Sequence, residues 1–225
     1  MPNTDVRRDS LVAYGDCNTL GFGESERRGF PEQIGDWLQR PVLNFGHTMS
    51  TTRELLEYAR DFPPKDHGIA LIQYGLVDSW LTFNGSPYVL YYPDSPLRKV
   101  LRKLVKKIKK YARVFRLQER WGAIEVVPIT EYVANIRHVV QSAPDTRFVL
   151  IATSPNLDTP RNPRILRYNE ALKALATAHA NCVYADPYEA VWADRDIAFY
   201  ADGTHLNAHG LMLVAATIRN ALNDQ

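Results

Sequence analysis

Residues 10–19, with the sequence SLVAYGDCNT, decide the fold of this 225-residue chain. An apolar run, Ser10–Asp16, ends in a glycine and an aspartate and is followed by small polar residues, which is typical of a buried strand entering a tight turn. Four later runs have the same form. They are Val42–Gly46, Gly68–Gly75, Arg147–Ser154 and Asn181–Asp186. Strands that are apolar on both faces indicate a parallel sheet covered on both sides.

Segments with helical spacing of apolar residues lie between and after these runs. The predicted helices are Gly29–Leu38, Thr51–Asp61, Ile129–Ser142, Pro163–Ala180 and Asn207–Leu222. Alternating strands and helices predict an α/β fold, a doubly wound sandwich with right-handed crossovers. In such sheets functional groups gather at the carboxyl ends of the strands. We therefore expect a single domain over residues 1–225.

One long connection, at about 79–128, interrupts this alternation and is predicted to be an insertion. Its first part is aromatic and rich in turn residues, and its second part is a basic amphipathic helix. Residues 97–116 contain ten basic residues and no acidic one. The chain's net charge of +2 therefore combines this segment with a remainder of 17 basic and 25 acidic residues, or −8.

Two loops carry residues suited to nucleophilic catalysis. Cys17 follows the first strand, where a turn would present its side chain at the edge of the sheet. Asp202 and His205 lie three residues apart on one loop before the last helix, so the carboxylate can hold the imidazole in one tautomer. Together they would supply a nucleophile, a base and a group that orients the base.

The sequence resembles the SGNH (GDSL-type) hydrolase superfamily of esterases, lipases and carbohydrate O-acyl esterases. The resemblance rests on four blocks in the family's order, namely Gly15-Asp16-Cys17-Asn18-Thr19, Asn44-Phe45-Gly46, Gly75-Leu76-Val77-Asp78 and Asp202-Gly203-Thr204-His205. It implies a three-layer α/β/α sandwich of flavodoxin-like type around a five-stranded parallel sheet. Two positions depart from the family pattern, because Cys17 replaces the usual serine and Val77 replaces the asparagine that donates to the oxyanion.

The resemblance also implies the roles of individual residues. Cys17, His205 and Asp202 would be catalytic, and the oxyanion hole would use the backbone amides of Cys17 and Gly46, with Asn18 offering a substitute side-chain amide. Substrate contacts are expected from a further set, Asp16, His47, Asp78 and Trp80. No cofactor is implied. His205 and His209 are four residues apart, but spacing places no third ligand with them, so no metal site is predicted.

The basic segment 98–116 leaves two interpretations open. Its helix could lie on an anionic membrane surface through Arg102, Lys103, Lys106, Lys107 and Lys110, or pack as a lid on the α/β body. No nucleic-acid partner is expected, because aromatic residues are not interleaved with the basic ones as a stacking platform requires. Residues 1–10 lack the apolar core of a signal peptide, and two cysteines make no disulfide framework, so a cytoplasmic or peripheral membrane location is expected.

The sequence therefore predicts an acyl-ester hydrolase or O-acyltransferase acting on a carbohydrate or a surface-polysaccharide intermediate. Two alternatives remain. One is a binding or scaffold protein of polysaccharide assembly that keeps the fold without catalysis, and the other is a non-acyl transferase that acts on a lipid-linked saccharide. The sequence does not predict the oligomeric state.

Overall fold

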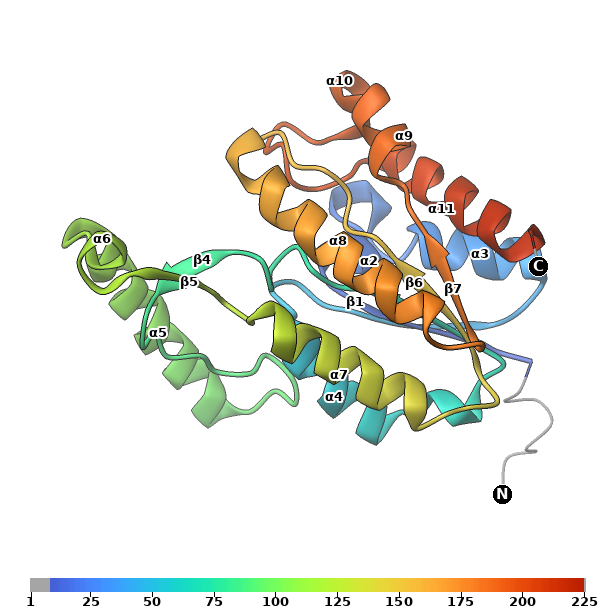
Figure 1. Ribbon diagram of the computed structural model, residues 1–225, viewed down its shortest axis with the longest axis horizontal. Coiled ribbons are helices and arrows are strands. Elements are labelled where there is room, and N and C mark those ends of the chain that lie inside the picture. The colour runs from blue at the N-terminus through green and yellow to red at the C-terminus, as the bar shows by residue number, and fades with distance from the viewer. Residues whose placement is uncertain (1–8, 225) are drawn as a thin grey trace.

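A computed structural model describes residues 9–224 and shows a three-layer α/β/α sandwich (Figure 1). Residues 1–8, on which the expectation about export largely rests, lie outside the described part of the chain. The central sheet is parallel and five-stranded, in the order β2-β1-β3-β6-β7. Its strands are β1 Leu11–Gly15, β2 Val42–Gly46, β3 Ile69–Gln73, β6 Arg147–Ile151 and β7 Cys182–Ala185. The predicted fold class and all five predicted strands are confirmed.

Helices cover both faces of this sheet and enclose two apolar cores. One face packs against α4 Thr52–Asp61, α7 Ile129–Gln141 and α8 Asn162–Thr177. The other face packs against α3 Phe30–Leu38, α9 Tyr188–Ala193, α10 Arg195–Ala198 and α11 Ala208–Asn223. Within the described residues, three short 3₁₀ turns complete the body, at Gly23–Ser25, Pro64–Asp66 and Thr159–Arg161.

The carboxyl ends of β1 and β2 are packed tightly against α2, a single turn of helix at Cys17–Leu20. A Cβ atom on Gly46 would lie 2.2 Å from the backbone nitrogen of Leu20, and one on Gly15 would lie 1.9 Å from Thr19 Oγ1. Both positions therefore need glycine for lack of space. This close approach fixes where the turn after β1 presents Cys17.

The insertion forms an arm, residues 81–125, that projects from the body (Figure 1). Its base is a two-stranded antiparallel ribbon of β4 Leu81–Phe83 and β5 Ala123–Glu125. Between these strands lie α5 Pro96–Val114 and α6 Leu117–Trp121. Within residues 9–224, no helix combines the length and the apolar character needed to cross a membrane.

Helix α5 turns an unexpected side toward the body. Among its residues with described side chains, the least exposed are Arg98, Arg102, Val105, Lys109 and Ala112. Other large apolar residues form an exposed stripe that faces away, namely Leu97, Leu101, Leu104, Ile108, Tyr111 and, directly after the helix, Phe115. Exposed fractions along that stripe reach 69% at Leu97, 53% at Leu104 and 57% at Phe115. A lid that packs its apolar face on the body is therefore not what the structure shows.

Candidate active site

The turn after β1 places Cys17 at the first position of α2. Asp16 caps this helix by accepting a hydrogen bond from the backbone N–H of Asn18 (2.9 Å). The Cys17 side chain is 5% exposed and belongs to a small apolar cluster with Leu76, Ile165 and Tyr188. The thiol thus lies just beneath the surface at the carboxyl edge of the sheet, beside the end of β3.

Asp16 is not a substrate ligand. It is completely buried, and Gln73 Nε2 donates to its second oxygen at 3.4 Å. Burial raises the pKa of Asp16 to about 7, with a smaller contribution from the charge of Asp78 and opposition from its hydrogen bonds. The prediction for Asp16 was wrong because the helix cap takes this side chain into the interior.

Asp202 and His205 form the pair that their spacing predicts. The carboxylate Oδ2 lies 2.5 Å from His205 Nδ1, and Oδ1 accepts the backbone N–H groups of Thr204 and His205 at 2.9 Å each. Partial burial would raise the pKa of Asp202, but the hydrogen bonds from His205 and Thr204 outweigh it and hold the pKa below its ordinary value. This arrangement directs the proton of the imidazole to Nδ1 and leaves Nε2 to accept another.

Asn18 joins the turn at Cys17 to the loop that carries His205. Its Oδ1 accepts the backbone N–H of Leu206 (2.9 Å), and its Nδ2 faces the carbonyl of Thr204 (3.5 Å). The neighbour of Cys17 therefore binds the residues on either side of His205. The 3.5 Å contact with Thr204 uses one of the two amide hydrogens of Asn18, so its role as an oxyanion donor stays a prediction. Its hydrogen bonds join the turn at Cys17 to the loop of His205.

The Cys17 thiol is neutral in this environment. Burial raises its pKa well above the ordinary value, and the charges of Asp16 and Asp202 raise it further, while the N–H groups of Cys17 and Asn18 lower it. Among the described residues, no hydrogen bond joins Cys17 to His205. The His205 ring instead stacks on Phe22, with ring centroids 4.1 Å apart and planes 12° apart. Local sequence patterns carry no signal for Phe22, because its role depends on a contact between opposite ends of the chain.

Gly46 does not offer a free amide to an oxyanion. Its N–H donates to Asn44 Oδ1 at 2.8 Å, and Asn44 is held in turn by Thr19 and Glu32. The predicted role in the oxyanion hole was wrong because the single N–H of Gly46 is already bonded to Asn44 within β2. The glycine is explained by its tight packing against α2. Of the two predicted backbone donors, only the Cys17 N–H is left.

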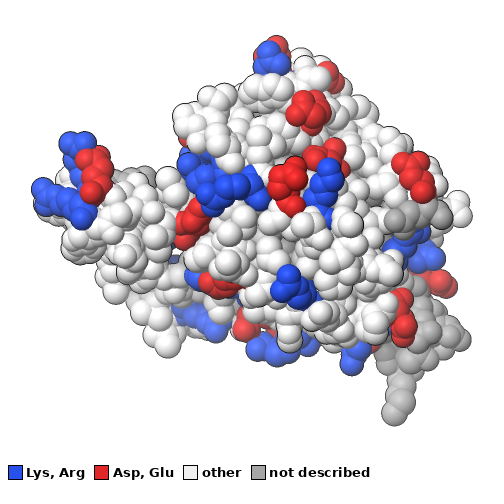
Figure 2. Space-filling view, viewed as in Figure 1, with Lys and Arg blue, Asp and Glu red and all other residues white. Residues whose placement is uncertain are grey.

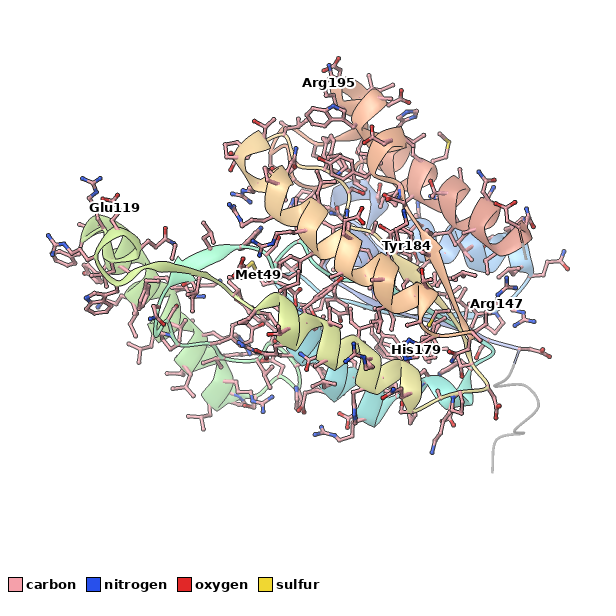
Figure 3. The ribbon with its side chains drawn as sticks, in the orientation of Figure 1. Met49, Glu119, Arg147, His179, Tyr184 and Arg195 are labelled. Carbon is pink, nitrogen blue, oxygen red and sulfur yellow. The ribbon has the colours of Figure 1, made fainter. Side chains whose placement is uncertain are left out.

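A cavity of about 540 Å³ lies between the body and the arm. On the body side its wall includes Met49, Val77 and Trp80, and on the arm side it includes Tyr88 and Tyr91. Met49, labelled in Figure 3, lies where the arm meets the body. Its φ of 66° is left-handed, a conformation that few residues other than glycine adopt. We call this space the arm cavity. Its described wall includes neither Cys17 nor His205, and the two regions are linked along the chain by Leu76, in the Cys17 cluster, which immediately precedes Val77.

Two other predicted substrate contacts lie beside the arm cavity. Trp80 lines it, carries the Arg161 guanidinium over its ring at 5.4 Å, and has a buried indole N–H without a hydrogen-bond partner within the described chain. His47 is half-buried, with its ring 5.8 Å from that of Tyr91. Trp80 is therefore open to a ligand in this cavity, whereas His47 lies next to the wall residue Tyr91 and is not part of the described lining.

Asp78, in contrast, is fully buried and cannot contact substrate. Its Oδ1 accepts both the backbone N–H and the hydroxyl of Thr52, at 2.9 and 2.8 Å, at the start of α4. Burial raises the pKa of Asp78 to about 6 against the effect of these bonds. The prediction for Asp78 was wrong because its side chain is buried against the start of α4, where it binds Thr52.

Glu54 is a buried residue that sequence reasoning missed. It accepts hydrogen bonds from the Tyr88 hydroxyl (2.8 Å) and from the Tyr91 backbone N–H (2.8 Å). It therefore attaches the aromatic part of the arm to α4. A capping box with Thr51 was its only local signal, and that pattern reveals nothing about the arm.

His209 has a partner that explains its place. Its Nε2 lies 2.7 Å from Asp194 Oδ2, while Asn207 caps the start of α11. Across residues 9–224 no group of three or more potential metal-binding side chains comes together. His209 therefore ties α11 to the loop after α9.

The sheet order, the thiol after β1 and the Asp–His pair before the last helix define an SGNH-type α/β/α sandwich. The chain belongs to the GDSL-like lipase/acylhydrolase family, which it matches over residues 9–212. No curated protein matches it significantly.

Solved structures show the same fold at low sequence identity. The acetylxylan esterase Axe2 from Geobacillus stearothermophilus superimposes with a TM-score of 0.65 and 17% identity, covering 96% of each chain. A lipase/acylhydrolase from Enterococcus faecalis gives a TM-score of 0.66 and 15% identity, over 96% of this chain and 95% of that one. A putative lipolytic protein of the G-D-S-L family from Desulfitobacterium hafniense DCB-2 gives 0.58 and 15%, over 95% and 99%.

Proposed function

We propose that the protein is an acyl-ester hydrolase in which Cys17 is the nucleophile, His205 the general base and Asp202 the residue that orients His205. The observation that carries this proposal is the Asp202–His205 hydrogen bond on a loop that Asn18 fastens to the Cys17 turn. A buried neutral thiol needs such a base, because it does not ionise by itself at neutral pH.

The reaction would proceed through a thioester. Cys17 Sγ attacks the ester carbonyl as its proton passes to His205 Nε2, and the Cys17 N–H donates to the oxyanion. The C–O bond breaks, and the leaving alcohol takes the proton from His205. Water then attacks the thioester, gives a proton to His205, and releases the acid as the thiol is restored. Attack by a second hydroxyl in place of water would make the protein an acyltransferase.

A carbohydrate ester is the proposed substrate. The arm cavity supports this assignment, because Trp80, Tyr88 and Tyr91 give it aromatic faces beside polar groups. Axe2 from Geobacillus stearothermophilus, which shares the fold, is an acetylxylan esterase, and an acylated saccharide as the substrate here is consistent with that likeness. An intermediate of polysaccharide assembly is one such substrate.

Trapping the acyl-enzyme tests the proposal. After brief incubation with 4-nitrophenyl acetate at neutral pH, we expect mass spectrometry to find one acetyl group on Cys17. Cys17→Ala should abolish this adduct, and Cys182→Ala, which removes the other buried cysteine, should keep it. A protein that remains folded yet never acetylates Cys17 would overturn the mechanism and favour a binding protein or a non-acyl transferase.

The exposed stripe of α5 favours a second proposed activity, reversible attachment to an anionic membrane. Leu97, Leu104 and Phe115 are more than half exposed, and Lys103 and Lys107 are exposed beside them. A second copy would bring the same cationic helix against itself, so the charges favour an anionic lipid surface. In Figure 2 the charged residues of the arm gather at its tip, and uncharged surface lies between this tip and the body. Arg102 was wrongly predicted to be one of the residues that face a membrane, because its side chain is 13% exposed and is paired with Asp94 at 2.5 Å.

Vesicle flotation measures this attachment. We expect the wild type to bind phosphatidylglycerol-containing vesicles, and Lys103→Gln/Lys107→Gln to bind about 30-fold more weakly, since each lysine near the surface contributes about 1 kcal/mol. Leu104→Ser/Ile108→Ser should also weaken binding. Equal binding by all three proteins, or a dimer that disappears in Leu104→Ser/Ile108→Ser, would refute membrane attachment.

A further inference from the structure

We infer that the arm cavity is an anion-binding subsite, so that the ester substrate carries a carboxylate or phosphate group on its carbohydrate part. This inference rests on the proposed function and adds the chemical class of its substrate. It comes from the side of α5 that faces the cavity, which is distinct from the apolar stripe.

The wall of the arm cavity is cationic on the arm side. Four basic residues of α5 line it, Arg102, Lys106, Lys109 and Lys110, and the described wall includes no acidic side chain. This concentration of one sign of charge beside an apolar floor raises the local concentration of anions. A neutral saccharide would gain nothing from it.

These cations differ in their availability. Arg102 donates to Asp94 and to the carbonyl of Leu90 (3.0 Å), and its guanidinium lies 5.1 Å from the centre of the Tyr91 ring. Lys106 and Lys110, in contrast, pair with no carboxylate in the described part of the chain. Arg102 thus shapes the wall, while the two lysines are left to bind a ligand.

The remaining walls are aromatic and suit a sugar ring held beside these lysines. Glu54 holds Tyr88 and Tyr91 on one side, and Trp80 lies on the other with an indole N–H that has no partner among the described residues. Val77 also lines the cavity and follows Leu76 of the Cys17 cluster in the chain. A ligand with its anionic group at α5 would therefore extend past Val77 to bring its ester to Cys17.

Calorimetry on the Cys17→Ala protein tests this inference without requiring turnover. The probes are three acetylated methyl glycosides, a neutral glucoside, a glucuronoside and a glucoside 6-phosphate. We expect the two anionic probes to bind at least about tenfold more tightly than the neutral one at low salt, and the difference to shrink at about 0.5 M NaCl. The glucuronoside and the phosphate separate the two sources of the anion.

A matched pair of variants locates the effect. Lys106→Gln/Lys110→Gln should lose about tenfold or more in affinity for the anionic probes only. Lys103→Gln/Lys107→Gln makes the same charge change on the same helix outside the cavity and should lose nothing. Equal affinity for all three probes, or equal losses in both variants, would overturn the inference. A missing Cys17 adduct alongside a clear anion preference would overturn the hydrolase mechanism alone.

Discussion

Asp202→Asn is expected to lower kcat for ester hydrolysis by about 10⁴, with little change in KM. The asparagine can still accept the N–H groups of Thr204 and His205, so the loop should keep its shape. If its amide group faces His205 Nδ1, the imidazole proton moves to Nε2, where the base can no longer accept the thiol proton. Steady-state kinetics with 4-nitrophenyl acetate measures the loss.

The pH dependence of the residual rate provides a second measurement. Because the pKa of Cys17 lies above the assay range, the thiolate fraction rises about tenfold per pH unit. Without a working base, the Asp202→Asn rate should follow that slope between about pH 7.5 and 9.5, whereas the wild type should vary less.

Asp194→Asn supplies the control, because it alters another Asp–His pair, with His209, at a distance of 2.7 Å. We expect its rate to stay within about twofold of wild type. If Asp202→Asn keeps more than a tenth of the activity while its thermal unfolding is unchanged, His205 is not the base.

The order of secondary structure could be predicted because it depends on local pattern. Each strand of the sheet is a short apolar run, although β2, at the sheet edge, is only partly buried, and Gly15 and Gly46 mark the turns where backbone segments approach closely. The Asp202–His205 hydrogen bond could also be predicted, because the two residues are three positions apart on one loop. These features need no knowledge of distant contacts.

The failures share a different cause, which is that sequence position does not give side-chain direction. Asp16 and Asp78 follow strands at the correct edge, yet helix capping turns both into the interior. The backbone N–H of Gly46 is bonded to the side chain of Asn44, two residues earlier in the chain. The apolar face of α5 is exposed because α5 is held out on the arm, with Arg102, Lys109 and Ala112 on the side toward the body.

Val77→Asn is expected to raise kcat by about 100-fold. Val77 is 2% exposed and lines the arm cavity beside the Cys17 cluster. With the Gly46 N–H bonded to Asn44, the Cys17 N–H is the remaining backbone donor of the predicted pair, and one hydrogen of the Asn18 amide is directed at Thr204. One added side-chain donor typically contributes 10²–10³ in rate, or about 3–4 kcal/mol. The gain should appear in kcat with the 4-nitrophenyl ester.

Val77→Ala is the matched control, since it opens the same space without adding a donor. If Val77→Asn is no faster than Val77→Ala, a missing oxyanion donor does not limit the reaction. Comparison with the wild type then decides between the two proposed roles. A wild type that turns over slowly and gains in Val77→Asn is an esterase with a weakened oxyanion hole. If the wild type binds acetylated glycosides without turnover and only the Val77→Asn variant hydrolyses them, the natural protein is a binding protein in which this valine prevents catalysis.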